Sequence, residues 1–398
     1  MKSVLIISAT FPPEPIVSAQ ISYALADELS GSNNVTVICP KPTRPAGFNF
    51  ERGAQKYQFQ KIVLDSYTCP ESCLLGRLRE TYSFGKACKN YIENNHQDID
   101  IIYMNAWPLL GQYLIVKAAK MFNLSLILHV QDIYPESLTN KMPHFLKGFL
   151  QKILLPLDQY ILSNSSQIIA ISCNMKKYLL QSRKLNEENI TVIANWQNES
   201  KFIDFKLNND NNLLSENFTF MYLGNIGPVA EVEFLIKCFA EANLSEARLV
   251  IAGAGSMKAH CQKLSSTYLD SKIEFWDVPD GKVPEIQSLA DVMLLPVKKG
   301  SARSSIPSKL PAYMFSKKPI LACVDIDSDT ADSILQSGCG WVIEPENKRQ
   351  LIGMLKSICK ESRESRIQKG ENGFNYAISR YTKTVNLKKI TDLITKLA

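Results

Sequence analysis

Short apolar runs alternate with longer amphipathic stretches through both halves of the chain, and this alternation limits the fold more than any other feature of the sequence. Runs such as Val4–Ser8 and Ser125–Val130 have the length of parallel strands that are buried on both faces. The amphipathic stretches between them fit the helices that would cover such strands. The pattern therefore predicts an α/β protein with two Rossmann-like, doubly wound parallel sheets, one in each half.

The apolar runs place the strands and the clearest helices. The predicted strands are Val4–Ser8, Val35–Cys39, Ile101–Met104, Ser125–Val130, Gln167–Ala170, Ile190–Ile193, Phe218–Leu223, Arg248–Ala252, Lys272–Trp276, Val292–Leu295, Pro319–Val324 and Trp341–Ile343. Helices are predicted to begin near Val17 and Glu231 and to cover Val283–Ala290, Ser308–Phe315, about Asn347–Lys369 and Thr382–Leu397.

A polar segment, Asn195–Glu216, separates the two halves. We expect an N-terminal domain over residues 1–197 and a C-terminal domain over residues 198–381, with the last helix, about 382–398, free to pack back on the first domain. Because ligands bind beyond the carboxyl ends of the strands in such sheets, the two domains are expected to face each other across a cleft.

Charge and cysteine usage exclude several classes of protein. The net charge of +6 is spread over 45 basic and 39 acidic residues, which is too mild and too dispersed for a nucleic-acid-binding protein. The ten cysteines are scattered, and only Cys69 and Cys73 are close neighbours. We therefore expect reduced thiols and no cysteine metal site.

The start of the chain and one internal segment bear on location. The only apolar run at the start is Val4–Ile7, far shorter than a signal peptide or a membrane span, so we expect a cytoplasmic enzyme. The segment Met142–Leu162 is amphipathic and carries Lys147 and Lys152, which would suit peripheral contact with the inner face of an anionic membrane. Packing of this helix into the core is the alternative.

Two glycine turns follow predicted strands in the second half. Gly224 and Gly227 follow the strand that ends at Leu223, and Gly253 and Gly255 follow the next one. Glycine lets the backbone approach a ligand, and the N–H groups of a following helix favour phosphate. The alternative is a turn that only joins strand to helix. The third glycine of a dinucleotide fingerprint is missing, which disfavours a nicotinamide dehydrogenase.

The segment Arg303–Pro311 opens a predicted helix, with Ser308 as its cap and Lys309 in its first turn. A lysine in a first turn opposes the helix dipole, which suggests another role, such as pairing with a diphosphate. A solvated surface lysine is the alternative.

Polar residues also follow two strands of the first half. His129 lies near the end of an apolar strand and is followed by Gln131 and Asp132, where a parallel sheet presents its ligands. A buried core histidine is the alternative for His129. The proline-rich loop Thr10–Ser18 would hold Glu14 at the cleft for contact with an acceptor hydroxyl, or would serve only as a rigid turn.

Together these residues resemble the retaining glycosyltransferases of family four, whose two-domain architecture is called GT-B. The resemblance covers essentially the whole chain, and it is closest to the transferases that build bacterial O-antigen, capsule and colanic acid. Its most specific parts are the first strand with its proline loop, His129–Pro135, Phe220–Gly227, Gly253 and the block Ala290–Pro319.

The resemblance implies a donor held by the second domain, a lipid-linked or oligosaccharide acceptor held by the first, no metal or other cofactor, and retention of configuration. UDP is the commonest donor nucleotide of the family. The implied donor residues are Gly224 and Gly227 near the diphosphate, Gly253 and Gly255 in the pocket, Val278 near the base, and Ser308 with Lys309 at the phosphate and ribose end.

The sequence departs from the family pattern in its charged residues. Asn225 and Ile226 stand where many members carry a basic pair, so Arg303 and Lys309 would have to neutralise the leaving diphosphate. Where many members have two glutamates, this chain has Ser304 and Ala312, with Asp325 or Asp329 as candidate substitutes. Gln131 falls at the place of the family's histidine, and His129 comes two residues earlier.

These features predict front-face sugar transfer. Lys309 and Arg303 would absorb the charge of the departing diphosphate, His129 or Asp132 would orient the sugar, and Glu14 and Gln131 would contact the acceptor. No carboxylate pair at glycosidase spacing is evident.

Two other classes stay open. A nucleotide-sugar epimerase of the same fold would need acid and base groups in the cleft. The chain has only four histidines, which disfavours this class. A non-catalytic partner subunit would explain the missing glutamates and basic pair.

Overall fold

The computed structural model describes residues 1–14, 16–44, 56–69, 73–105, 109–139, 144–208, 218–302 and 306–398. Its internal contacts divide the chain into two compact units. Unit 1 comprises Met1–Ala194 and Leu387–Ala398, and unit 2 comprises Asn195–Asn386. The boundary placed from the sequence, between residues 197 and 198, lies close to the point where the chain first leaves unit 1.

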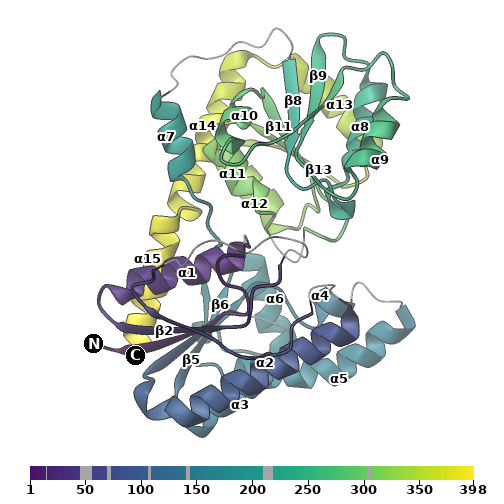
Figure 1. Ribbon diagram of the computed structural model, residues 1–398. Helices are drawn as coiled ribbons and strands as arrows, with labels where there is room; N and C mark the ends of the chain where they lie inside the picture. The colour runs from purple at the N-terminus through teal and green to yellow at the C-terminus, as the bar shows by residue number, and fades with distance from the viewer. Residues whose placement is uncertain are drawn as a thin grey trace. The chain divides into compact units, whose positions relative to one another are not determined.

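A seven-stranded parallel sheet forms the centre of unit 1 (Figure 1), in the order β3-β2-β1-β4-β5-β6-β7. The strands are β1 (Ser3–Ile7), β2 (Asn34–Cys39), β3 (Gln60–Val63), β4 (Ile101–Asn105), β5 (Ser125–Val130), β6 (Gln167–Ala170) and β7 (Ile190–Val192). Every strand predicted in this half is present, and the edge strand β3 was not predicted. The order reverses between β1 and β4, so the loops after these two strands flank the switch point of the sheet.

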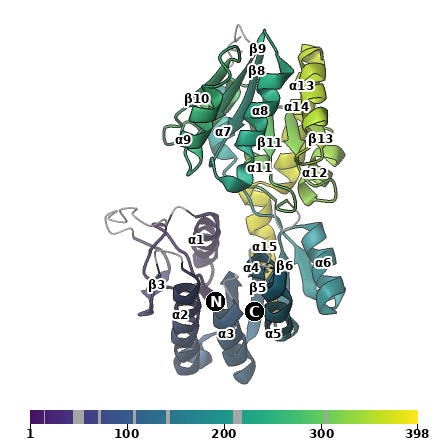
Figure 2. The ribbon, with the colours of Figure 1, turned by 90° about the vertical axis from the view of Figure 1, so that its right-hand side faces the viewer.

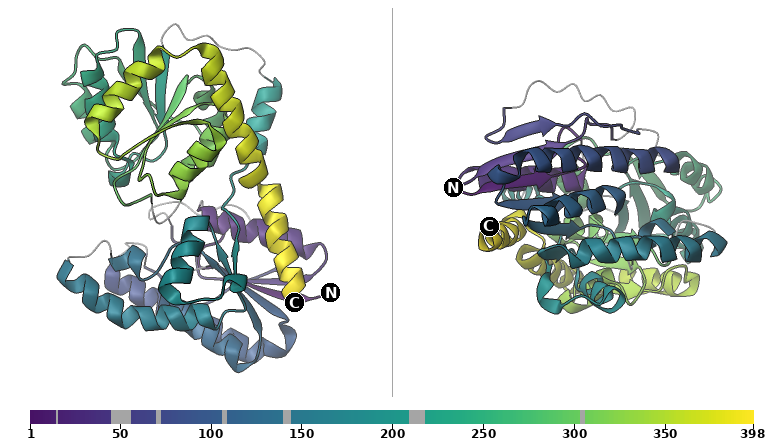
Figure 3. Two further views of the ribbon diagram at one scale, coloured as in Figure 1. Left: turned by 180° about the vertical axis from the view of Figure 1, so that it is seen from behind. Right: turned by 90° about the horizontal axis from the view of Figure 1, so that it is seen from below.

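Helices cover both faces of this sheet. They are α1 (Val17–Ser30), α2 (Leu74–Asn95), α3 (Leu109–Met121), α4 (Glu136–Thr139), α5 (His144–Ser163), α6 (Cys173–Arg183) and the terminal α15 (Lys383–Leu397). Apolar residues of α2, α3, α5 and α6 pack with those of the strands into one core. Figure 3 shows α2, α3 and α5 side by side from below, and α1 and the end of α15 lie on the other face.

Unit 2 contains a six-stranded parallel sheet in the order β10-β9-β8-β11-β12-β13. The strands are β8 (Phe218–Leu223), β9 (Ala247–Ala252), β10 (Ile273–Trp276), β11 (Val292–Pro296), β12 (Ile320–Cys323) and β13 (Gly340–Ile343). Here the order reverses between β8 and β11. Every residue of β4, β6, β11 and β12 is buried, as expected of parallel strands covered on both faces. The predicted α/β class with two doubly wound sheets is thus confirmed.

The helices of unit 2 also lie on both faces of its sheet, and Figure 2 shows α8 and α9 beside the strands that they connect. The helices are α7 (Ser200–Asn208), α8 (Val232–Ala242), α9 (Lys258–Ser265), α10 (Val283–Ser288), α11 (Lys309–Phe315), α12 (Asp329–Ser337), α13 (Lys348–Cys359) and α14 (Arg363–Arg380). The prediction of a single helix over 347–369 is wrong, because α13 and α14 are separate helices. The Ser362 hydroxyl accepts a hydrogen bond from Ser365 N and so starts a new helix there.

Within the described residues, no helix combines the length and the apolar character needed to cross a bilayer.

Candidate functional site

Two glycine turns lie side by side beyond the carboxyl ends of β8 and β9. Gly224 N donates to Ala252 O at 3.0 Å, and Ile226 N donates to Ala254 O at 2.8 Å. The parallel ladder of the sheet therefore continues into the turns, which holds both in register. The turns thus lie beyond the end of the sheet at which ligands of doubly wound folds bind.

Glycine is required in these turns because their backbones nearly touch. A Cβ built on Gly253 would lie 2.2 Å from the carbonyl oxygen of Gly224, closer than any side chain can approach. Both residues have positive φ, 127° at Gly253 and 153° at Gly224, in the region that favours glycine. Gly255 meets the same constraint, since its Cβ would lie 2.3 Å from Ile226 O.

Lys309, the first residue of α11, extends along the Gly224 turn. A Cβ on Gly224 would lie 2.1 Å from Lys309 Cε, and the Lys309 ammonium lies 5.2 Å from the centre of the Tyr222 ring. The side chain is partly buried, and burial lowers its pKa. It makes no hydrogen bond or ion pair with any residue that the structure describes. Because an unpaired buried cation is unfavourable, this position suits an anionic ligand.

Two contacts hold the elements around Lys309 together at the switch point of the sheet. The Tyr313 hydroxyl of α11 donates to Leu223 O at 2.8 Å and accepts from Leu223 N at 3.1 Å, which ties α11 to the end of β8. Lys298 N, in the loop after β11, donates to Val229 O at 2.9 Å beyond the glycine turn. The loops after β8 and β11 thus meet where the strand order reverses.

The structure therefore brings Gly224, Gly253, Gly255 and Lys309 together. Two other predicted donor residues, Gly227 and Val278, lie in neighbouring loops. Gly227 precedes a short 3-10 helix, Pro228–Ala230. The φ of Gly227 is −118°, so its conformation does not require glycine. Val278 follows β10, whose last residue accepts a hydrogen bond from Gly253 N, so it lies in the loop next to the second turn.

Four further predicted residues follow β11 or β12 in the sequence. Ser308 directly precedes α11, but its side chain makes no capping hydrogen bond, and the predicted cap is wrong because the residue is itself helical, with φ −58° and ψ −16°. Arg303 lies outside the described residues. The Asp325 carboxylate accepts the Gly300 N–H at 2.8 and 3.1 Å and so holds the loop after β11. Asp329 is the first residue of α12.

A polar network occupies the switch point of unit 1. Asn105 Nδ2, at the end of β4, donates to Ser22 Oγ at 2.9 Å and to Ser18 O at 3.1 Å. Gln131 Nε2 donates to Asn105 Oδ1 at 3.2 Å, and Asp132 beside it is exposed. Gln131 and Asp132 thus lie at the carboxyl edge of the sheet, as predicted from their place after β5. Sequence reasoning missed Asn105, although a polar residue ending a buried strand was the available signal.

His129 lies inside the sheet and has no exposed surface. Its Nδ1 is 2.6 Å from the Tyr103 hydroxyl, and its Nε2 has no partner among the described residues. Burial lowers the pKa of His129 to about 3, so the ring is neutral. This geometry favours the core histidine over a residue that orients the sugar.

Glu14 is also buried, and its carboxylate is already engaged. It accepts hydrogen bonds from Phe11 N at 3.1 Å and from Thr43 N and Arg44 N, both at 2.9 Å. The expected contact with an acceptor hydroxyl is therefore not supported. Glu14 instead joins the proline-rich loop to the segment after β2, which corresponds to the rigid-turn alternative.

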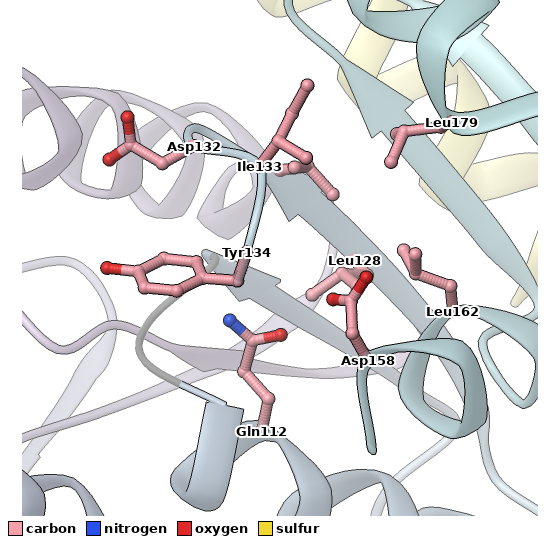
Figure 4. Close-up of a pocket in the computed structure, with 9 residues that line it drawn as sticks. Gln112, Leu128, Asp132, Ile133, Tyr134, Asp158, Leu162 and Leu179 are labelled. Carbon is pink, nitrogen blue, oxygen red and sulfur yellow. The ribbon is translucent and has the colours of Figure 1, made fainter. Parts of the chain in front are cut away.

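A small cavity lies beneath the loop that carries Gln131 and Asp132 (Figure 4). Its lining includes the polar side chains of Gln112, Tyr134 and Asp158 and the apolar side chains of Leu128 and Leu162. Among the residues that the structure describes, no group of three or more His, Cys, Asp or Glu side chains is suited to hold a metal ion.

Two protein-family models match this chain. The model described as Glycosyltransferase Family 4 matches residues 19–200, and that described as Glycosyl transferases group 1 matches residues 217–361. Among curated proteins, WbjE of Pseudomonas aeruginosa, described as a probable glycosyltransferase, is 21% identical over 273 residues. That match covers 66% of each protein, just under two thirds of either length.

Solved structures share the fold over the full length of the chain. Sucrose-phosphate synthase from Thermosynechococcus elongatus matches with a TM-score of 0.74 at 15% identity, covering 100% of this chain and 99% of that one. HepE of Anabaena, solved in complex with UDP, matches with a TM-score of 0.70 at 15% identity and 100% coverage of both chains. WaaG, described as a glycosyltransferase of lipopolysaccharide biosynthesis, matches with a TM-score of 0.66 at 15% identity, covering 98% and 99%.

Proposed function

Because this chain belongs to glycosyltransferase family 4 and has the GT-B type of fold, we propose that it moves a sugar from a nucleoside diphosphate sugar, with UDP as the nucleotide, onto a lipid-linked or oligosaccharide acceptor. The acceptor would be a growing surface polysaccharide, with retention of the anomeric configuration. The observation that carries this proposal is Lys309, a partly buried ammonium that lies against the Gly224 turn and has no anionic partner among the described residues.

The donor diphosphate would lie over the two glycine turns. There the Lys309 ammonium and backbone N–H groups would take up the negative charge that develops as the nucleoside diphosphate leaves. The structures of HepE with UDP and with UDP-glucose support this choice of donor class, since that protein shares the fold. Arg303 would add a second positive charge.

The acceptor would bind at the carboxyl edge of unit 1. Gln131 and Asp132 lie there beside the Asn105 network, and the exposed Asp132 carboxylate can accept a hydrogen bond from a sugar hydroxyl. WaaG, which shares the fold and is described as a glycosyltransferase of lipopolysaccharide biosynthesis, supports an acceptor of this class.

Contact with a membrane would bring the enzyme to a lipid-linked acceptor. Along α5, Phe149 is 64% exposed and Ile153 is 54% exposed, one helical turn apart, with exposed Lys152 next to them. This face suits the headgroup region of an anionic bilayer. Changing both apolar residues to serine should reduce cosedimentation with anionic vesicles, whereas Leu269→Ser, at a residue 90% exposed in unit 2, should not.

The proposed chemistry needs no metal ion, because Lys309 and backbone N–H groups replace it. A chelator should therefore leave nucleotide release unchanged. Loss of release that added Mg²⁺ or Mn²⁺ restores would contradict this part of the proposal.

The test of the whole proposal measures release of nucleoside diphosphate from a panel of nucleotide sugars, with and without a lipid-linked acceptor. Wild type is compared with Lys309→Ala and with Lys356→Ala, which removes an exposed lysine from α13. Acceptor-dependent release that falls about 100-fold only in Lys309→Ala supports a transferase. Binding without turnover across the panel would favour the partner subunit, and a changed free nucleotide sugar would favour the epimerase.

A further inference from the structure

Arg183, the last residue of α6, is a buried cation at the centre of three elements of unit 1. Its side chain is 1% exposed. Its Nε donates to Asp158 Oδ2 of α5 at 2.6 Å, and its Nη2 donates to Tyr134 O at 2.7 Å. The same Nη2 donates to both oxygens of the Glu136 carboxylate, at 2.7 and 2.9 Å. One guanidinium thus holds two carboxylates and a backbone carbonyl.

Two of these partners lie just beyond β5, Tyr134 in the loop that follows it and Glu136 at the start of α4. Tyr134 and Glu136 come directly after Gln131 and Asp132, the residues at the carboxyl edge of the sheet. A second hydrogen bond, from the Tyr178 hydroxyl to Glu136 Oε1 at 2.7 Å, joins the same carboxylate to α6. The loop is therefore attached to α6 at its far end, and only a few residues separate this attachment from Asp132.

Ile133 of this loop packs into the apolar core, and a small cavity lies beneath the neighbouring part of the loop. In Figure 4 the Asp132 carboxylate is turned away from that of Asp158, and the cavity lies between Tyr134, Gln112 and Asp158. Directional, charge-assisted bonds such as those of Arg183 add a geometric restraint to the packing of the loop. Asp158 holds the same guanidinium from α5, since its Oδ2 accepts the hydrogen bond from Nε at 2.6 Å.

We propose that Arg183 is a positioning residue for the acceptor side of sugar transfer: through Tyr134 O and Glu136 it sets where Gln131 and Asp132 meet the acceptor. The proposal rests on the transferase function above. If Arg183 acts on the acceptor side alone, its loss should change the rate of transfer to the acceptor but not the rate of nucleotide release without acceptor. Loss of Arg183 should slow transfer to the acceptor, whereas binding of the nucleotide and its slow release without acceptor depend on unit 2 and should persist.

The experiment uses the full chain and the variants Arg183→Lys and Glu136→Gln. Lysine keeps the charge but lacks the fork that reaches several partners at once. Glu136 is 18% exposed, so glutamine there should be tolerated even if Arg183→Lys fails to fold. Lys177→Met, an exposed position on α6, is the matched control. Each protein is assayed for acceptor KM and kcat, for nucleotide release without acceptor, for UDP affinity and for thermal unfolding.

We expect kcat/KM for the acceptor to fall at least about tenfold in both variants, with UDP affinity and acceptor-independent release within about twofold of wild type. Transfer and acceptor-independent release falling by the same factor would reduce Arg183 to a stabilising residue and overturn the proposal. So would unchanged transfer in folded Glu136→Gln and Arg183→Lys. If wild type transfers to no acceptor, the proposed function itself fails, and the role of Arg183 fails with it.

Discussion

Gly224 and Lys309 come from distant parts of the sequence and meet at the end of β8. The contact is so close that a methyl group on Gly224 would displace the end of the lysine side chain, which is flexible and can move. Both residues were predicted for the donor site, Gly224 because glycine follows a buried strand and Lys309 because a lysine is unfavourable in a first turn. Their contact with each other could not be predicted without the fold.

Gly224→Ala should therefore weaken nucleotide binding more than it weakens the fold. We expect the Kd of UDP to rise at least about tenfold, because the Lys309 ammonium is pushed from its place and positive φ strains an alanine. Calorimetric titration and urea unfolding measure the two effects. Gly353→Ala is the control, since nothing lies within 4 Å of the new methyl group in α13. Equal UDP affinity in both variants would argue against this geometry.

His129 gives the fold a dependence on acid. Its pKa in the folded protein, about 3, lies below the ordinary value of 6.5, so the unfolded chain binds a proton that the folded one does not. The contribution of His129 to stability is present above pH 6.5 and is lost as the pH falls below it, by up to about 1.4 kcal/mol per pH unit.

Urea unfolding of wild type and His129→Gln at several pH values between 7 and 4.5 measures this loss. The free energy of unfolding of wild type should fall relative to the variant as the pH decreases. Two parallel curves would mean that His129 becomes protonated in the folded state.

Arg183 shows what could not be predicted from the sequence at this scale. At the end of an amphipathic helix it resembles a solvated cation. Its partners Glu136 and Asp158 lie in other elements, and no local spacing joins them. His129 and Glu14 show the reverse case, since their positions in the sequence suggested functional groups, whereas the structure buries both side chains.

At the scale of elements, buried strands were predicted well because burial on both faces leaves a continuous apolar run. The edge strand β3 was missed because its sequence, Gln-Lys-Ile-Val, has only two apolar residues and none of them is buried. The break between α13 and α14 was missed because both helices are amphipathic and only the Ser362 cap separates them. The deciding contact is the pairing with β2 for β3 and the local cap at Ser362 for the break, and neither changes the apolar pattern.

The packing of α2 on α3 depends on two glycines, and this gives a prediction at the same scale. A Cβ on Gly85 would lie 2.5 Å from the α-carbon of Gly111, a backbone atom that cannot move aside. Gly85→Ala should therefore destabilise the protein by about 1–3 kcal/mol, although alanine favours helices. Gly148→Ala, in open space on α5, should be neutral or stabilising by up to about 1 kcal/mol.

Urea unfolding of the two glycine variants distinguishes these outcomes. An increase in stability for Gly85→Ala similar to that of Gly148→Ala would show that the two helices can separate at no cost.

At the scale of the whole molecule, the last residues complete the unit in which the chain begins. Residues Leu387–Ala398 belong to unit 1, and Leu387, Ile390 and Ile394 of α15 are buried there. Deleting residues 387–398 should remove several kcal/mol from the stability of unit 1, at about 1.5–3 kcal/mol for each buried side chain.

Scanning calorimetry of the deletion variant should show a transition of unit 1 at lower temperature. Ile390→Ala in the full chain should lower the transition temperature by less, because it should cost about 2–5 kcal/mol of stability. Unchanged transitions in both proteins would mean that α15 contributes nothing to unit 1.

The path of the chain has a consequence for recombination. Unit 2 is an insertion within unit 1, and its two ends are joined to each other, since Gln197 pairs with Thr382 and Gln197 N donates to Tyr381 O at 3.1 Å. A single crossover near residue 195 between two genes of this family would combine the first part of unit 1 with a foreign α15. A chimaera that changes only unit 2 therefore needs two crossovers, one near residue 195 and one near residue 386, whether it arises in a genome or is engineered.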